Sequence, residues 1–159
     1  MTASHPFGDA PLALTHRLRL PAVVAPDSAD APPPMLLLLH GIGSDERDLL
    51  SLGARLDPRF LIVSARSPLR LAQGGFGWYR TNFTERGPVM IDPAEAEEGL
   101  RTLAEFVPAA ARAYGADERA VYLAGFSQGA IMSLALLLTA PELVAGAALM
   151  SGRILPGIQ

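Results

Sequence analysis

The sequence predicts a single α/β domain with a mostly parallel, doubly wound sheet, and three observations lead to this prediction. Short apolar runs rich in β-formers alternate with longer helix-like segments over residues 1–159, without an internal repeat. The run Met35–Leu39 is apolar throughout, which is typical of a central parallel strand covered on both faces. Half of the residues are hydrophobic, yet no run approaches the roughly 18 residues of a membrane-spanning helix. A chain of this length can bury a core.

Composition and charge exclude several classes of function. The net charge is −3 with both signs scattered, so no basic patch invites nucleic acid. The chain has no cysteine, no P-loop and no residues spaced as a metal site, and we therefore expect neither a metal nor a cofactor. The N-terminus lacks the pattern of a signal peptide, and we expect a cytoplasmic protein without a transmembrane segment.

The N-terminal part predicts an edge strand followed by a linker. Apolar and polar residues alternate over Leu12–Leu20, as in a half-buried antiparallel strand. His16 lies on the apolar side, and we interpret it as a hydrogen-bonded structural histidine. The proline-rich segment 26–34 is predicted to be a surface linker within the domain.

A helix is predicted after the central strand. Ser44 resembles an N-cap and Glu46 lies in the first turn, where the helix dipole favours an acid. This helix is predicted to continue to about Leu56, and Phe60–Ala65 is predicted to form the next strand.

Residues 66–91 show no clear periodicity and contain most of the aromatic side chains. A long structureless stretch inside a domain is usually functional or mobile. We interpret it as a loop over a site, with Phe76, Trp78 and Tyr79 shaping a substrate pocket. The alternative, that each aromatic residue only anchors the loop to the core, is equally compatible with the sequence.

A second helix is predicted from Asp92 to about Tyr114. Asp92 is a suitable N-cap, Pro93 suits the first helical position, and Pro108 is expected to interrupt the helix. The acids of its first turns are interpreted as a solvated face and not as a catalytic or metal-binding cluster; they are Glu95, Glu97 and Glu98.

The segment Val121–Gly129 carries the most informative pattern in the chain. A short β-rich run ends at Gly125, Ser127 lies between Gly125 and Gly129, and a helix-like run follows. This is the strand, sharp turn and helix of a G-x-S-x-G nucleophile elbow. The glycines remove Cβ atoms that would collide where strand and helix approach each other. A last strand is predicted at Val144–Met150.

Four motifs in this order resemble the bacterial phospholipase/carboxylesterase family of α/β-hydrolases, which includes the acyl-protein thioesterases. They are His40-Gly41-Ile42-Gly43, Ser64-Ala65-Arg66-Ser67-Pro68, Gly74-Gly75 followed by Trp78-Tyr79, and Gly125-Phe126-Ser127-Gln128-Gly129. The resemblance covers the chain from about Leu36 to Ser151 and implies an α/β-hydrolase fold.

The resemblance also implies roles for individual residues. Ser127 matches the nucleophile that forms an acyl-enzyme with a small ester or thioester substrate. The backbone N–H groups of Ile42 and Gln128 match the oxyanion hole. His40 matches a histidine that shapes the loop and is not the general base; the supporting residues are His40, Gly41, Gly43, Gly125 and Gly129.

The sequence departs from the family pattern after the nucleophile. The chain order in such hydrolases is Ser, then Asp or Glu, then His. After Ser127, only Glu142 is acidic and no histidine occurs. The resemblance implies roughly two more strands and two helices beyond Gln159, which would carry the triad aspartate and histidine.

Two functional classes follow from this pattern. The first is a carboxylesterase or thioesterase whose C-terminal part lies outside these residues, so that the 159-residue chain alone is inactive or nearly so. The second is a non-catalytic remnant or binding module that keeps the pocket. An exposed strand edge at Val144–Met150 would favour pairing with a second copy, and a homodimer is one candidate assembly. The sequence leaves open whether the substrate is a short-chain ester, a lysophospholipid or an acylated protein.

Overall fold

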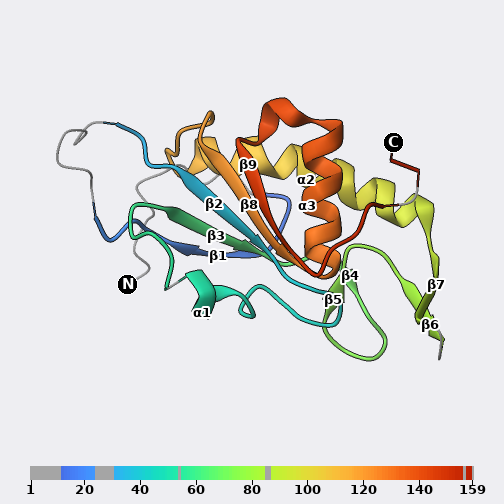
Figure 1. The fold of residues 1–159 in the computed structure, drawn as a ribbon. Helices are drawn as coiled ribbons and strands as arrows, with labels where there is room; N and C mark the ends of the chain where they lie inside the picture. The colour runs from blue at the N-terminus through green and yellow to red at the C-terminus, as the bar shows by residue number, and fades with distance from the viewer. Residues whose placement is uncertain (1–11, 24–30, 54, 85–86, 156, 159) are drawn as a thin grey trace.

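The computed structural model describes residues 12–23, 31–53, 55–84, 87–155 and 157–158. Its centre is a five-stranded sheet in the order β1–β3–β2–β8–β9 (Figure 1). The strands are β1 (His16–Arg19), β2 (Met35–Leu39), β3 (Leu61–Ala65), β8 (Val121–Phe126) and β9 (Gly146–Met150). β1 is antiparallel to β3, and every other neighbouring pair is parallel. The predicted mostly parallel sheet with an antiparallel edge strand is therefore confirmed, although β1 is shorter than Leu12–Leu20.

Successive side chains of a strand point to opposite faces of the sheet. The two faces are covered by different helices. Helices α2 (Pro93–Ala113) and α3 (Gln128–Thr139) lie on one face (Figure 1). The larger core cluster joins them to the sheet and includes Met35, Leu37, Leu39, Leu103, Phe106 and Met132. On the other face, Leu36 and Leu38 form a smaller cluster beside the short helix α1 (Leu50–Gly53). All of β2 is buried, as the sequence predicts.

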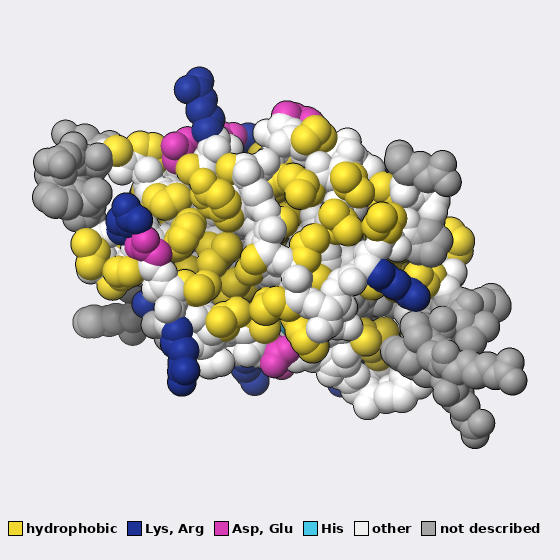
Figure 2. All heavy atoms as spheres, viewed as in Figure 1, with side chains coloured by type: hydrophobic (Ala, Val, Ile, Leu, Met, Phe, Trp, Pro, Cys, Tyr) yellow, Lys and Arg dark blue, Asp and Glu magenta, His cyan; other side chains and the backbone are white. Residues whose placement is uncertain are grey.

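An apolar groove of about 610 Å³ lies on the α1 face, where β8 and β9 have less covering. Its lining includes Leu36, Leu52, Tyr122, Ala147 and Met150. Figure 2 shows hydrophobic side chains gathered over the region where these strands lie. β9 is the last strand of the sheet on this side, and within the described residues no strand pairs with its outer edge.

The helix predicted from Ser44 to Leu56 is much shorter in the structure. Among the described residues of this segment, only Leu50–Gly53 is α-helical, and Ser44 forms a β-bridge with Phe76 instead of an N-cap. Glu46 turns inward to bind Arg66 and does not lie in a first helical turn. The prediction was wrong because these long-range contacts outweigh the local capping preference.

Residues 66–91 contain four short strands, so the prediction of a structureless loop was wrong. β4 (Leu69–Arg70) pairs with β5 (Phe76–Gly77), and β6 (Thr81–Thr84) pairs with β7 (Gly87–Ile91). Both pairs are antiparallel, and β6–β7 contains a register shift. Ladders this short and irregular give too few alternating positions to be recognised in the sequence.

α2 begins as predicted, with Asp92 as its N-cap. The Asp92 carboxylate accepts hydrogen bonds from the N–H groups of Ala94 (3.0 Å) and Glu95 (3.3 Å). The helix continues through Pro108, so the predicted interruption there was wrong. Glu95 binds the backbone N–H (2.7 Å) and guanidinium of Arg80. Within the described residues, no three potential ligands lie together as a metal site.

Other predictions concern the N-terminal part and membrane insertion. His16 is a structural histidine: its Nδ1 donates to Leu14 O at 2.7 Å, and Nε2 contacts the Tyr114 hydroxyl.

The predicted linker 26–34 lies partly outside the described residues, and Ala31 and Pro32 are exposed. Among the helices that the structure describes, none has the length and apolar character required to cross a bilayer.

Candidate active site

Ser127 occupies the turn between β8 and α3, with φ 50° and ψ −115°. A positive φ is uncommon for a residue with a side chain and marks local strain. The turn is held by the Ser127 N–H, which donates to Met150 O at 2.8 Å. The predicted strand-turn-helix geometry around this serine is confirmed.

The two glycines of the G-x-S-x-G pattern allow strand and helix to approach closely. A Cβ atom on Gly125 would lie 2.4 Å from the carbonyl carbon of Gly129. A Cβ atom on Gly129 would lie 2.0 Å from the carbonyl oxygen of Leu39 in β2. Because real side chains essentially never tolerate such distances, each position requires glycine in this backbone.

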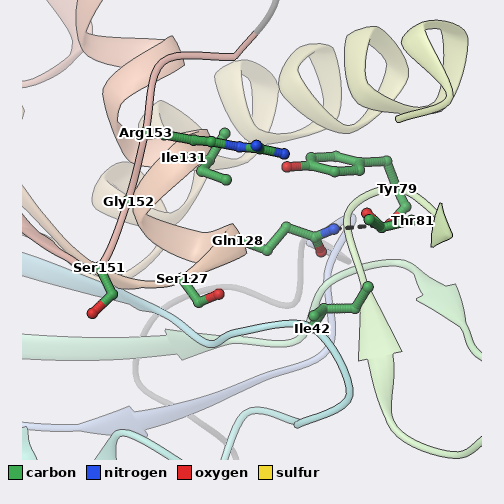
Figure 3. Close-up of a pocket in the computed structure, with 9 residues that line it drawn as sticks. All are labelled: Ile42, Tyr79, Thr81, Ser127, Gln128, Ile131, Ser151, Gly152 and Arg153. Atoms are coloured by element: carbon green, nitrogen blue, oxygen red, sulfur yellow. Dashed lines mark hydrogen bonds between the residues drawn. The ribbon is translucent and has the colours of Figure 1, made fainter. Parts of the chain in front are cut away.

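The Ser127 side chain projects into a cavity of about 250 Å³ (Figure 3). The cavity lies where β8 and β9 end, beside the first turn of α3 and the loop after β2. Its lining residues are Ile42, Tyr79, Thr81, Ser127, Gln128, Ile131, Ser151, Gly152 and Arg153. A second cavity of about 380 Å³ shares Ile42 and Thr81 with it.

Two backbone N–H groups at this cavity are available as donors. Ile42 lies in the loop after β2, and Gln128 is the first residue of α3. The first N–H groups of a helix have no partner inside the helix. Within the described part of the chain, neither Ile42 N–H nor Gln128 N–H donates to a backbone carbonyl. A serine hydroxyl and two unused donors therefore line one cavity, an arrangement that suits an oxyanion.

The hydrogen bonds of His40 define its tautomer. A carbonyl oxygen can only accept, so Nδ1 carries the proton that is donated to Gly41 O at 2.7 Å. An amide N–H can only donate, so Nε2 accepts from Ser67 N at 3.1 Å. Burial lowers the pKa of His40 below its ordinary value, against weaker opposite effects of nearby acids. His40 is thus a neutral, fully engaged histidine; His16 is engaged elsewhere, and His5 lies outside the described residues.

The three aromatic residues predicted to shape a pocket occupy different positions. Tyr79 lines the cavity with Ser127. Trp78 is 1% exposed and belongs to the core cluster, and it is not among the residues lining either cavity beside Ile42. Phe76 is half-buried beneath the Arg66 guanidinium. The structure therefore places only Tyr79 where the predicted pocket role requires it, because Trp78 points into the core.

Sequence reasoning missed the side chain of Gln128. Its Oε1 accepts from the Trp78 N–H at 2.7 Å, and its Nε2 donates to Tyr79 O at 2.8 Å. This buried amide therefore joins the start of α3 to the backbone of the aromatic segment. No local motif indicates such a contact, since the residues are about fifty positions apart in the chain.

The segment after β9 was also missed. Ser151 has a positive φ of 58°, and Ser151, Gly152 and Arg153 line the cavity. In Figure 3 the Arg153 side chain extends toward the Tyr79 ring. Burial raises the pKa of Tyr79, and the charge of Arg153 partly opposes this shift. The only feature of the sequence that could have indicated a site here is that the segment directly follows the predicted strand Val144–Met150.

Known proteins resemble this chain in fold and in sequence. The carboxylesterase from Bacillus cereus superposes with a TM-score of 0.76 and 27% identity, over 92% of this chain and 64% of that protein. The carboxylesterase from Mesorhizobium loti gives a TM-score of 0.74 and 26% identity, over 96% of this chain and 68% of that protein. MhqD of Bacillus subtilis (strain 168) is 30% identical over 115 residues, 72% of this chain and 55% of MhqD.

The fold is thus that of the α/β-hydrolases, and the chain spans between about half and two thirds of the length of these relatives. The model of one family, Phospholipase/Carboxylesterase, matches residues 19–159. That match extends over most of the chain and includes both the Ile42 loop and the Ser127 turn. The chain belongs to the phospholipase/carboxylesterase family.

Proposed function

We propose that the complete protein is a serine hydrolase that cleaves carboxylic esters or thioesters through an acyl-enzyme on Ser127. The observation that carries this proposal is the strained Ser127 turn, which presents a hydroxyl to a cavity with two unused N–H donors. Membership of the phospholipase/carboxylesterase family supports the same chemistry.

The proposed reaction has two steps. Ser127 Oγ attacks the carbonyl carbon while a general base removes the hydroxyl proton, and the oxyanion accepts hydrogen bonds from Ile42 and Gln128. The carbon–oxygen or carbon–sulfur bond then breaks, and the alcohol or thiol leaves with that proton. Water attacks the acyl-enzyme in the second step, which releases the carboxylic acid and restores the serine.

The general base and its carboxylate are proposed to come from outside the described residues. His40 and His16 already use both ring nitrogens in hydrogen bonds. Glu142 is exposed in the 3₁₀ turn Pro141–Leu143, beyond the far end of α3 from Ser127. A serine hydroxyl without a base is a poor nucleophile. We therefore expect only a trace rate from the 159-residue chain alone.

A binding module is the second candidate function for the 159-residue chain. It is favoured by one observation: the cavity and both free N–H groups form although no histidine of the described residues lies free beside Ser127. Hydrolysis of p-nitrophenyl acetate from pH 5 to 9 distinguishes the two candidates. We expect turnover with an inflection near neutral pH only from the product of the complete reading frame. If neither protein shows such turnover, the binding module is the better description.

Replacement of the serine tests the proposed nucleophile. In the product of the complete reading frame, Ser127→Ala should abolish hydrolysis except for a residual rate. The matched control is Ser51→Ala, which changes an exposed serine of α1 away from the cavity. Retention of full activity by Ser127→Ala would place the nucleophile elsewhere.

The substrate class needs a separate measurement. Short-chain esters, lysophospholipids and acylated proteins share the same reacting carbonyl, so the chemistry of Ser127 does not distinguish them. A panel of p-nitrophenyl esters with increasing acyl length, beside a lysophospholipid and an acylated peptide, ranks them by kcat/KM. We expect the small cavity of about 250 Å³ to favour short acyl chains.

A further inference from the structure

The loop Gly41–Asp45 is held at both ends by two consecutive residues at the end of β3. At its start, His40 Nε2 accepts a hydrogen bond from Ser67 N–H at 3.1 Å. At its end, Glu46 accepts two hydrogen bonds from the Arg66 guanidinium, at 2.6 Å to Oε2 and 2.8 Å to Oε1. Because Arg66 and Ser67 are adjacent, the two ends of the loop are fixed relative to each other.

The contact at the Glu46 end is an ion pair between a buried carboxylate and an arginine whose side chain is 28% exposed. Glu46 is 1% exposed, and it is the only charged residue among the buried residues of the described chain. The Arg66 hydrogen bonds lower the pKa of Glu46 to about 2, so the carboxylate stays ionised at neutral pH. Arg17 provides a second, weaker cation with its Nε 3.8 Å from Oε1. A buried carboxylate depends strongly on its partner, unlike one in a surface ion pair.

The middle of the loop is tied to the same arginine through Phe76. Gly43 N–H donates to Phe76 O at 2.8 Å, and Phe76 N–H donates to Ser44 O at 2.9 Å. The Arg66 guanidinium lies 4.5 Å from the centroid of the Phe76 ring, in a cation–π contact. One side chain thus contacts both Glu46 and Phe76, which hold the loop at different points.

We propose that Glu46 and Arg66 are positioning residues, whose ion pair fixes the Ile42 N–H relative to Ser127. This inference rests on the proposed function, because it assigns the Ile42 N–H to the oxyanion hole. Neither Glu46 nor Arg66 lines the cavity, so both act through the loop and not on the substrate. An oxyanion donor must lie about 2.7–3.1 Å from the developing charge, so a small shift of the loop weakens it.

The kinetic consequence is specific. An interaction made mainly in the transition state lowers kcat when it is weakened, whereas KM for a small ester changes little. Removal of a complete oxyanion donor lowers kcat by about 10²–10³. For Glu46→Gln, which displaces the donor without removing it, we expect kcat to fall about 10–100-fold and KM to change less than about 3-fold.

The test uses the product of the complete reading frame with p-nitrophenyl acetate. Arg66→Lys is the second variant, since lysine keeps the charge but not the two parallel hydrogen bonds, and it should lose less kcat than Glu46→Gln. Val107→Ala is the stability control, because Val107 is buried in α2 on the opposite face of the sheet. All variants are assayed well below their Tm.

Three results would overturn the inference: a parental kcat in Glu46→Gln, a loss no greater than in Val107→Ala, or a loss confined to KM. If Glu46→Gln does not fold, Arg66→Lys decides by the same criteria. Ser127→Ala separates this inference from the proposed function. An active Ser127→Ala variant refutes the proposed function, whereas an inactive one beside a Glu46→Gln variant with parental kcat refutes only the positioning role.

Discussion

The two segments that meet at the cavity are held in place in different ways. The Ser127 turn has its glycines beside it in the chain: Gly125 lets β8 approach α3, and Gly129 lets α3 approach Leu39 in β2. The Gly41–Asp45 loop depends on Arg66 and Phe76, which lie much later in the chain. The glycine spacing that permits the serine turn is therefore visible in the local sequence, whereas the contacts that place the Gly41–Asp45 loop are not.

The largest expected effect comes from the Ser127 turn. Gly129→Ala should lower the free energy of unfolding by more than about 3 kcal/mol, because its Cβ would lie 2.0 Å from Leu39 O. Gly146→Ala is the control, since the nearest atom to its Cβ would be Tyr122 Cδ1 at 3.6 Å, an ordinary contact. Urea denaturation measures both. Equal stability of the two variants would contradict the close approach.

The next effect concerns the aromatic segment Phe76–Tyr79, which contacts both the Gly41–Asp45 loop and Gln128 after the Ser127 turn. Trp78→Ala should lower the free energy of unfolding by about 3–5 kcal/mol, because the indole is buried in the core. Tyr79→Phe should change the preference among acyl lengths more than the Tm, because Tyr79 lines the cavity. Thermal denaturation and the ester panel provide the two readouts. A shift in preference caused mainly by Trp78→Ala would restore its predicted pocket role.

A smaller effect is expected at the contact between α3 and this aromatic segment. Gln128→Met keeps the volume but leaves the Trp78 N–H and the Tyr79 carbonyl without their partner. We expect the free energy of unfolding to fall by about 2 kcal/mol, within the range for an unsatisfied buried polar group. Gln73→Met, at an exposed glutamine, should change it by less than about 0.5 kcal/mol. Similar unfolding midpoints for the two variants would argue against this contact.

The smallest effect is a pH dependence of stability that arises from His40, at the start of the Gly41–Asp45 loop. Burial lowers the pKa of His40 in the folded state, so the unfolded chain takes up a proton first as pH falls below about 6.5. Stability is therefore expected to fall between pH 7.5 and 5.5, at no more than about 1.4 kcal/mol per pH unit from this group. His40→Gln should show a flatter profile in urea denaturation. An unchanged slope would contradict a neutral His40.

The elements of the fold also differ in how far the sequence predicts them. The strand Met35–Leu39 and the Ser127 turn were predictable because apolar continuity and glycine spacing act locally. The prediction of a helix from Ser44 was wrong because Glu46 binds Arg66. The two residues are 20 positions apart, so a short stretch of sequence does not reveal this contact.

The candidate site was predictable to a similar extent. The sequence motifs located Ser127, Ile42 and Gln128, which the structure brings to one cavity. The sequence did not indicate the two contacts of the Gln128 side chain or the approach of Arg153, because both depend on how distant segments pack. For Trp78 the sequence left a pocket role and a core role open, and the structure places its side chain in the core.

Covalent labelling tests the central claim most directly. The product of the complete reading frame is incubated with a fluorophosphonate probe, digested, and the modified residue is located by peptide mass spectrometry. We predict one label per chain on Ser127, and no label on the Ser127→Ala variant under the same conditions. A label on another residue, or unchanged labelling of Ser127→Ala, would contradict the assignment of Ser127 as the nucleophile.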